Sequence, residues 1–140
     1  MYTKPVGAIC KRHGLLHYFY ADDSQLYLSF KPIDIVTTNK AIQRIENCLA
    51  DIVAWMHSNM LKLNADKTEL MIFTPKQTSK HMVNISNISV KVGDSIAISK
   101  PCVMNLGAMF DSNMDMELQV NSVCRAAYAQ LRKIGHIRRY

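Results

Sequence analysis

The chain has 140 residues, 49% of them hydrophobic, and a formal net charge of +6. This length suits one small domain, and the apolar content argues against wholesale disorder. No apolar run is long enough to span a bilayer, and Lys4 and Pro5 interrupt the N-terminus too early for a signal peptide. We therefore expect an intracellular chain, nuclear or cytoplasmic, with no membrane association and with a charge compatible with a polyanionic partner.

The cysteines and histidines show no metal-binding pattern. The four cysteines are scattered without a Cys-x-x-Cys pair, and no histidine stands at zinc-finger spacing from them. We expect reduced structural thiols at Cys10, Cys48, Cys102 and Cys124.

The first predicted strands form a hairpin over residues 15–30. Residues 1–14 could hold the end of a helix that runs into a turn at His13 and Gly14. Two aromatic-rich segments then flank the run Tyr20-Ala21-Asp22-Asp23-Ser24, and Pro32 stops the second segment. The pattern predicts two short strands joined by a tight turn with two adjacent carboxylates at its tip.

Adjacent carboxylates on a rigid turn make a site for a hard cation such as Mg²⁺. An ordinary acidic turn is the alternative, because an Asp side chain can bond the turn backbone. The turn lacks the Gly that a two-residue connection usually uses, and neighbouring acids repel each other. Both features favour a cation or a function.

Residues 39–60 carry the clearest helical pattern. Apolar residues recur at spacings of three and four from Ile42 to Met60, which predicts a core-facing stripe and no cofactor site. Thr37 or Thr38 can cap the start, and Asn59 can end the helix in a left-handed conformation.

Several strands are predicted next. Residues 61–75 suggest a turn followed by a strand at 69–73, and residues 90–98 suggest a hairpin around Gly93 and Asp94. Residues 103–110 read as one strand with Gly107 inside it, where an interior Gly marks a bulge or a close backbone approach.

A final helix is predicted from about Asp115. Its apolar stripe consists of Val120, Val123, Ala127, Leu131, Ile134 and Ile137. Arg125, Arg132 and Arg139 recur every seven residues and share a face roughly opposite that stripe. A solvated face and a phosphate-contacting face are both open interpretations.

Three segments in order resemble the reverse transcriptases of LINE-type (non-LTR, jockey-like) retrotransposons. Residues 17–27, with Tyr20-Ala21-Asp22-Asp23, are similar to the catalytic hairpin of the palm. Residues 55–69 are similar to the helix, turn and strand that follow it. Residues 105–112 resemble the strand that grips the primer, and the helix after them resembles the first thumb helix. The resemblance extends over essentially the whole chain.

The resemblance implies roles for individual residues. Asp22 would coordinate catalytic Mg²⁺, with Mn²⁺ as a substitute, and Asp23 would support the metal site. Tyr20 would lie beneath the primer terminus. Lys67 would be near the leaving pyrophosphate, although a solvated turn lysine is an equally open interpretation. Leu106 and Gly107 would approach the primer backbone, in the two-metal scheme of nucleotidyl transfer.

The implied fold is α+β: a partial reverse-transcriptase palm at residues 1–112, followed by the start of a thumb helix at 113–140. The family uses three carboxylates, and no Asp or Glu occurs between Met1 and Tyr20. We therefore expect a fragment of an RNA-directed DNA polymerase that is inactive alone. Its partners in the full enzyme would be an RNA template, a DNA primer and a dNTP.

Two alternatives remain open: a basic nucleic-acid-binding fragment without catalysis, and a functionless relic of a mobile element. We also expect an exposed sheet edge at the hairpin, which would favour self-association.

Overall fold

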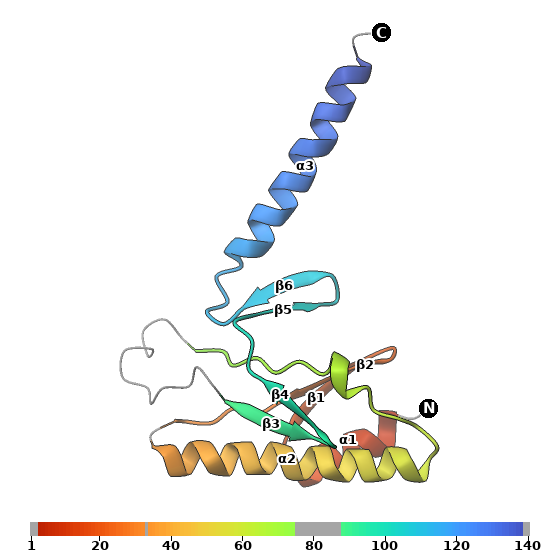
Figure 1. The fold of residues 1–140 in the computed structure, drawn as a ribbon, viewed down its shortest axis with the longest axis vertical. Coiled ribbons are helices and arrows are strands. Elements are labelled where there is room, and N and C mark those ends of the chain that lie inside the picture. Colours follow the sequence, from red (N-terminus) through yellow and green to blue (C-terminus); the bar gives the residue numbers. More distant parts are fainter. Residues whose placement is uncertain (1–2, 33, 75–87, 139–140) are drawn as a thin grey trace. The chain divides into compact units, whose positions relative to one another are not determined.

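The computed structural model describes residues 3–32, 34–74 and 88–138 (Figure 1). Within these residues the fold is α+β, as predicted, with three α-helices and three separate two-stranded antiparallel sheets. The elements in chain order are α1 (Thr3–Arg12), β1 (Leu16–Tyr20), β2 (Asp23–Tyr27), α2 (Ile35–Ser58), the 3₁₀ helix η1 (Ala65–Lys67), β3 (Ser89–Val92), β4 (Ser95–Ile98), β5 (Cys102–Asn105), β6 (Ala108–Asp111) and α3 (Glu117–Ile137).

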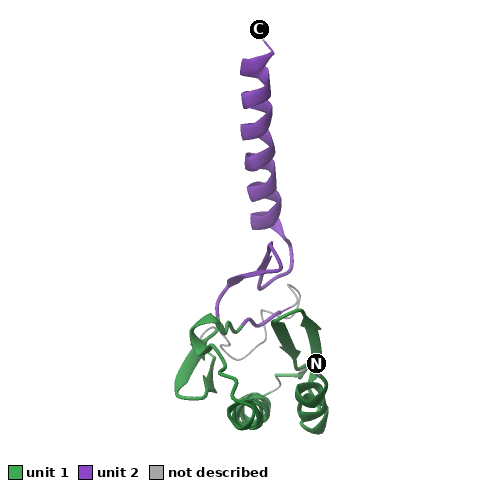
Figure 2. Ribbon diagram, turned by 90° about the vertical axis from the view of Figure 1, so that its right-hand side faces the viewer, with its two compact units in different colours: residues 1–70, 80–99 green, residues 71–79, 100–140 purple. Residues whose placement is uncertain are grey.

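The chain divides into two compact units (Figure 2). The first unit comprises residues 1–70 and 80–99, and the second comprises residues 71–79 and 100–140. The boundary predicted between residues 112 and 113 refers to subdomains of a larger enzyme and stays a prediction.

The first unit contains a core between α1, α2 and the first hairpin. Its buried residues are Val6, Ile9, Cys10, Leu15, Cys48 and Ile52. Phe19 and Leu26 of the β1–β2 hairpin pack against this cluster. Burial raises the pKa of the Cys10 thiol and raises the pKa of Cys48 to about 12, so both side chains are neutral thiols near pH 7. Two predictions are confirmed here: the end of a helix within residues 1–14, which is α1, and the hairpin within residues 15–30, which is β1–β2.

Helix α2 begins earlier than its sequence pattern predicted. Asp34, and neither threonine, is the N-cap, and its Oδ1 accepts a hydrogen bond from the Thr37 N–H at 2.6 Å. Hydrogen bonds from the side chain and then the backbone of Thr37 lower the pKa of Asp34. The predicted left-handed end at Asn59 is also wrong, because Asn59 has a φ of −107° and the positive φ of 57° falls on Met60. Met60 is 96% exposed, so the core stripe ends before it.

A second cluster lies on another side of α2. Leu49 packs with Val90 and Val92 of β3, and the Lys91 N–H donates to Glu46 Oε1 at 2.8 Å. The predicted hairpin around Gly93 is confirmed, with a φ of 60° at that glycine. The predicted strand at 69–73 is wrong: within the described residues only Leu70 forms a bridge there, parallel to Ser99.

The second unit corrects one further prediction. Residues 103–110 do not form one strand, because the chain reverses at Leu106 and Gly107 to form the β5–β6 hairpin. At the end of β6, the buried carboxylate of Asp111 accepts three backbone hydrogen bonds, from Asn113, Asp115 and Met116. The predicted C-terminal helix is confirmed as α3, which starts directly after these residues.

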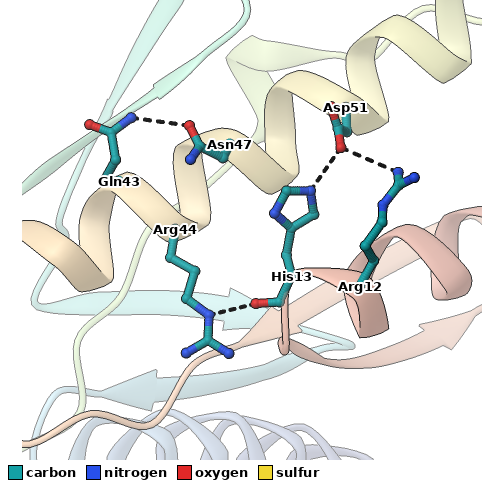
Figure 3. A network of polar contacts seen from close by, with 6 residues as sticks. All are labelled: Arg12, His13, Gln43, Arg44, Asn47 and Asp51. Carbon is teal, nitrogen blue, oxygen red and sulfur yellow. Dashed lines mark hydrogen bonds and ion pairs between the residues drawn. The ribbon is translucent and has the colours of Figure 1, made fainter.

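A polar network ties α1 and the turn after it to α2 (Figure 3). Asp51 accepts hydrogen bonds from His13 Nε2 at 2.8 Å and from Arg12 Nη2 at 3.2 Å. Arg44 donates to the carbonyl oxygens of His13 and Gly14 at 2.5 Å and 3.0 Å. Gly14 has a φ of 67°, and a Cβ built there would lie 1.8 Å from Arg44 Nη2. Only glycine fits this turn without displacing the arginine.

This network predicts a pH dependence of stability. The hydrogen bond from His13, assisted by the charge of Arg12, lowers the pKa of Asp51. A carboxyl group with a lowered pKa stabilises the fold above its unfolded-state pKa of about 4 and loses that contribution as the pH falls through its folded-state pKa. The free energy of unfolding should therefore fall on acidification below about pH 4, and less steeply in Asp51→Asn.

An NMR titration of the Asp51 carboxyl group checks the cause. We expect His13→Ala, which removes the hydrogen-bond donor, to raise the pKa of Asp51 toward its ordinary value. An unchanged Asp51 pKa in that variant would contradict the assignment.

Candidate functional site

The tip of the β1–β2 hairpin carries the two predicted metal-binding carboxylates. Tyr20 of β1 pairs with Asp23 of β2, so the two-residue turn consists of Ala21 and Asp22. Asp22 therefore lies in the turn, whereas Asp23 is the first residue of a strand. Both side chains are exposed. The alternating apolar pattern and the acidic run predicted a hairpin with an acidic tip, and the register adds that Asp23 belongs to the strand.

Ala21 holds the turn in an unfavourable backbone conformation. Its φ is 53°, a region in which the Cβ of an L-residue meets its own backbone. A two-residue hairpin turn with positive φ at its first central position normally has Gly there. Here the surrounding strand pairing holds an alanine in that position, directly before the carboxylates.

Replacing Ala21 by glycine should therefore stabilise the hairpin. We expect a gain of about 0.5–1 kcal/mol in the free energy of unfolding, since the relieved strain exceeds the added unfolded-state entropy. Urea denaturation measures the change. Ala50→Gly, at an exposed position inside α2, should instead cost about 0.5–1 kcal/mol. Equal losses in the two variants would contradict strain at Ala21.

The two faces of the hairpin differ. Phe19 and Leu26 face the first core, while the opposite face exposes an apolar and aromatic surface. The members of this exposed face are Leu16, Tyr18, Tyr20 and Tyr27. Tyr20 is 58% exposed and stands directly opposite Asp23. Tyr18 and Tyr27 were not predicted as site residues, although the period-two alternation of the strands places them on the face of Tyr20.

Tyr27 is oriented by a neighbour on its own strand. Its hydroxyl group donates a hydrogen bond to Gln25 Oε1. Tyr18 pairs with Gln25 across the hairpin. The exposed face therefore combines tyrosine rings, suited to stacking, with polar groups at the end that carries the carboxylates.

Asp22 and Asp23 supply oxygen ligands of the type that Mg²⁺ prefers. In residues 3–32, 34–74 and 88–138, no group of three or more His, Cys, Asp or Glu side chains is placed to hold a metal ion. Two adjacent exposed carboxylates can bind one hydrated cation, but they cannot fix two ions in a defined geometry.

Lys67 ends the 3₁₀ helix η1 in the first unit and is exposed. Among the residues that the structure describes, no hydrogen bond or ion pair joins Lys67 to Asp22 or Asp23. Its predicted role near a leaving pyrophosphate stays a prediction.

Leu106 and Gly107 form the turn of the β5–β6 hairpin in the second unit. Both have positive φ, 48° and 81°, which is the two-residue turn that matches the twist of paired strands. Both residues are exposed, and a Cβ built on Gly107 would meet no atom within 4 Å. The predicted approach of these two residues to a primer backbone stays a prediction.

Helix α3 exposes the predicted basic face. Arg125 and Arg132 are exposed on one side of the helix, and no Asp or Glu follows Glu117 in the sequence. Arg139 lies outside the described residues. The predicted apolar stripe of α3 is exposed as well, with Val120 at 56% and Ile134 at 60%.

The predicted site residues divide between the two units. Tyr20, Asp22, Asp23 and Lys67 belong to the first unit, and the others belong to the second. Comparison of the chain with protein-family models, with curated proteins and with solved structures finds no match. Among the helices of the described residues, none has the length and apolarity needed to cross a membrane.

Proposed function

We propose that this chain is a fragment of an RNA-directed DNA polymerase of the non-LTR retrotransposon type. The β1–β2 hairpin would be its catalytic turn, residues 1–112 part of its palm and residues 113–140 the start of its thumb. The observation that carries the proposal is the hairpin tip: two adjacent exposed carboxylates, next to an exposed tyrosine face, on strands anchored from behind by two helices.

Each residue of the tip has a distinct task in this proposal. Asp22, in the turn, would hold the cation, and Asp23, at the start of β2, would orient it through bound water. Tyr20, opposite Asp23, would support the terminal nucleotide of the primer by stacking. When bound, Mg²⁺ would neutralise the negative charge that develops on the transferred phosphate.

The isolated chain should be inactive. The carboxylates present at the tip fit one hydrated ion, whereas nucleotidyl transfer uses two ions in fixed positions. With an RNA template, a DNA primer, a dNTP and Mg²⁺, we expect no primer extension. Extension that disappears in Asp22→Asn would overturn this part of the proposal.

A graft tests the catalytic part directly. Residues 15–30 would replace the equivalent hairpin of an active non-LTR reverse transcriptase, which supplies the remaining carboxylate and the fingers. We expect the graft to extend a primer and Asp22→Asn to abolish extension. A graft that folds and binds primer and template but shows no extension would contradict a catalytic hairpin.

Cation binding can be tested in the chain itself. Mn²⁺ should broaden the NMR signals of residues 22 and 23, and Asp22→Asn should remove this broadening. The matched control is the β3–β4 turn, which carries the single carboxylate of Asp94. Equal broadening at Asp94 would support the ordinary acidic turn instead.

A second candidate function is nucleic-acid binding without catalysis, which the basic face of α3 favours. Arginine side chains that contact phosphates release counterions, so binding should weaken steeply with salt. We expect Arg125→Ala with Arg132→Ala to reduce the logarithmic salt slope for duplex binding by about 2. Lys31→Ala with Lys40→Ala, also exposed, is the matched control.

The third alternative is a relic of a mobile element without function. It is the remaining interpretation if the chain binds no nucleic acid and the graft shows no activity.

A further inference from the structure

The exposed apolar stripe of α3 has the spacing of a helix-pairing seam. Numbered as a heptad from Val120 at position a, the a positions are Val120, Ala127 and Ile134, and the d positions are Val123, Gln130 and Ile137. Five of these six positions are apolar, and Leu131 widens the seam at position e. This repeat is the pattern by which two helices pack together in a coiled coil.

The stripe is open along the described length of α3. Val123 is 55% exposed, Leu131 61% and Ile137 73%. Within the described residues, a hydrogen bond holds α3 near its start, where Gln119 Oε1 accepts from the Met109 N–H at 2.8 Å. A contiguous apolar surface of this kind marks a contact surface and not a solvated face.

The charges beside the seam select a partner and an orientation. Glu117 and Arg138 both fall at position e, at opposite ends of α3. In an antiparallel pair of identical helices, e positions face e positions, so Glu117 of one copy meets Arg138 of the other at both ends of the seam. Lys133, at position g, faces the small and neutral Ala126.

The parallel arrangement lacks this match. There, position g of one helix faces position e of the other, so Lys133 would meet Arg138 twice. Like charges placed opposite each other weaken the pair. Gln130 would also face its own copy in the seam, whereas the antiparallel pair places it opposite Ala127, which leaves room for a polar side chain.

We propose that two copies of this chain associate through α3 as an antiparallel two-helix pair. The arrangement is self-complementary, as a two-fold dimer requires. Arg125 and Arg132 occupy position f, which points away from the seam, so the paired helices present two basic faces to solvent.

Sedimentation of the full chain over a range of concentrations tests the association. We expect a reversible monomer–dimer equilibrium that weakens by about a hundredfold or more in Val123→Asp with Ile134→Asp, because both charges would be buried in the seam. Tyr128→Asp, at the exposed position b of the same helix, should leave the dimer intact. A monomer at all concentrations overturns the proposal. Association that survives the double variant also overturns it, and would indicate that the copies associate through exposed strand edges instead.

Charge exchange and cross-linking test the orientation. Arg138→Glu should weaken the dimer about tenfold, and adding Glu117→Arg should restore it. In a Cys102→Ser background exposed to dissolved oxygen as the oxidant, the thiols of Leu131→Cys and of Cys124 should form an intermolecular disulfide in the antiparallel dimer, since both residues are at position e. The antiparallel arrangement is overturned if the chain dimerises but the charge exchange does not restore the dimer. It is also overturned if the chain dimerises but this cross-link does not form.

Discussion

Ile52→Ala should lower the free energy of unfolding of the first unit by about 3 kcal/mol. The Ile52 side chain is 4% exposed and belongs to the cluster shared by α1, α2 and the first hairpin. Truncation would remove apolar contacts and leave a cavity that rigid helices cannot close. Urea denaturation followed by far-UV circular dichroism measures the change.

Ile35→Ala is the matched control, with the same substitution in the same helix. Ile35 is 62% exposed, so its truncation should change the stability by no more than about 0.5 kcal/mol. The hairpin tip rests on the core that contains Ile52. In a urea titration, the Ile52→Ala variant should therefore lose Mn²⁺-induced broadening at residues 22 and 23 near its own, lowered unfolding midpoint. Similar losses of stability in the two variants would contradict the described core.

Asp111→Ala should destabilise the second unit by about 2–3 kcal/mol. Its buried carboxylate accepts hydrogen bonds from three backbone N–H groups at 2.8–3.1 Å, directly before α3. Alanine would leave these donors without their acceptor at the point where β6 passes into the helix. Hydrogen exchange of the amides of residues 113, 115 and 116 should accelerate, and the first turn of α3 should fray.

Asp111→Asn separates the acceptor geometry from the charge. Asparagine keeps one acceptor oxygen, which can retain the bonds of Asn113 and Asp115 at Oδ1, and loses the bond from Met116 at Oδ2. We therefore expect an intermediate loss of stability. Unchanged protection of these amides in Asp111→Ala would show that Asp111 does not organise the start of α3.

Hairpins could be predicted from the sequence where turn residues and strand alternation agree. The β3–β4 hairpin has Gly93 in its turn and buried valines on one face, and both signals point to the same structure. The β5–β6 hairpin was missed because Leu106 adopts a φ of 48°, which leucine disfavours. The pairing of β5 with β6 outweighs this local preference, and the local sequence pattern does not predict that pairing.

The start of α2 was missed for a related reason. Ile35, Val36, Thr37 and Thr38 are β-branched and have low helix propensity, so the pattern indicated a later start. The cap at Asp34 outweighs that propensity, and the signal was available in the aspartate directly before the run. For the strand predicted at 69–73, no local signal of this kind was available. A strand also needs a partner strand to pair with, and the sequence of the segment does not show whether one is present.

The candidate site could be predicted as a set of residue types but not as an arrangement. The acidic tip and the alternation indicated which side chains are exposed, whereas the register decides that Asp22 lies in the turn and that Asp23 faces Tyr20. Lys67 and Leu106 came from the resemblance alone. Their relation to the tip depends on tertiary packing, which spacing along a sequence does not encode.

All three sheets of the described residues are hairpins with two-residue connections, at 21–22, 93–94 and 106–107. Hairpins that close such short loops form within microseconds, without a search for distant partners. The long-range steps that remain include the docking of α1 and of β3 on α2 and the parallel bridge between Leu70 and Ser99. Folding should therefore be fast and limited by helix docking, and the turn that carries Asp22 and Asp23 should take shape before the core beneath it is complete.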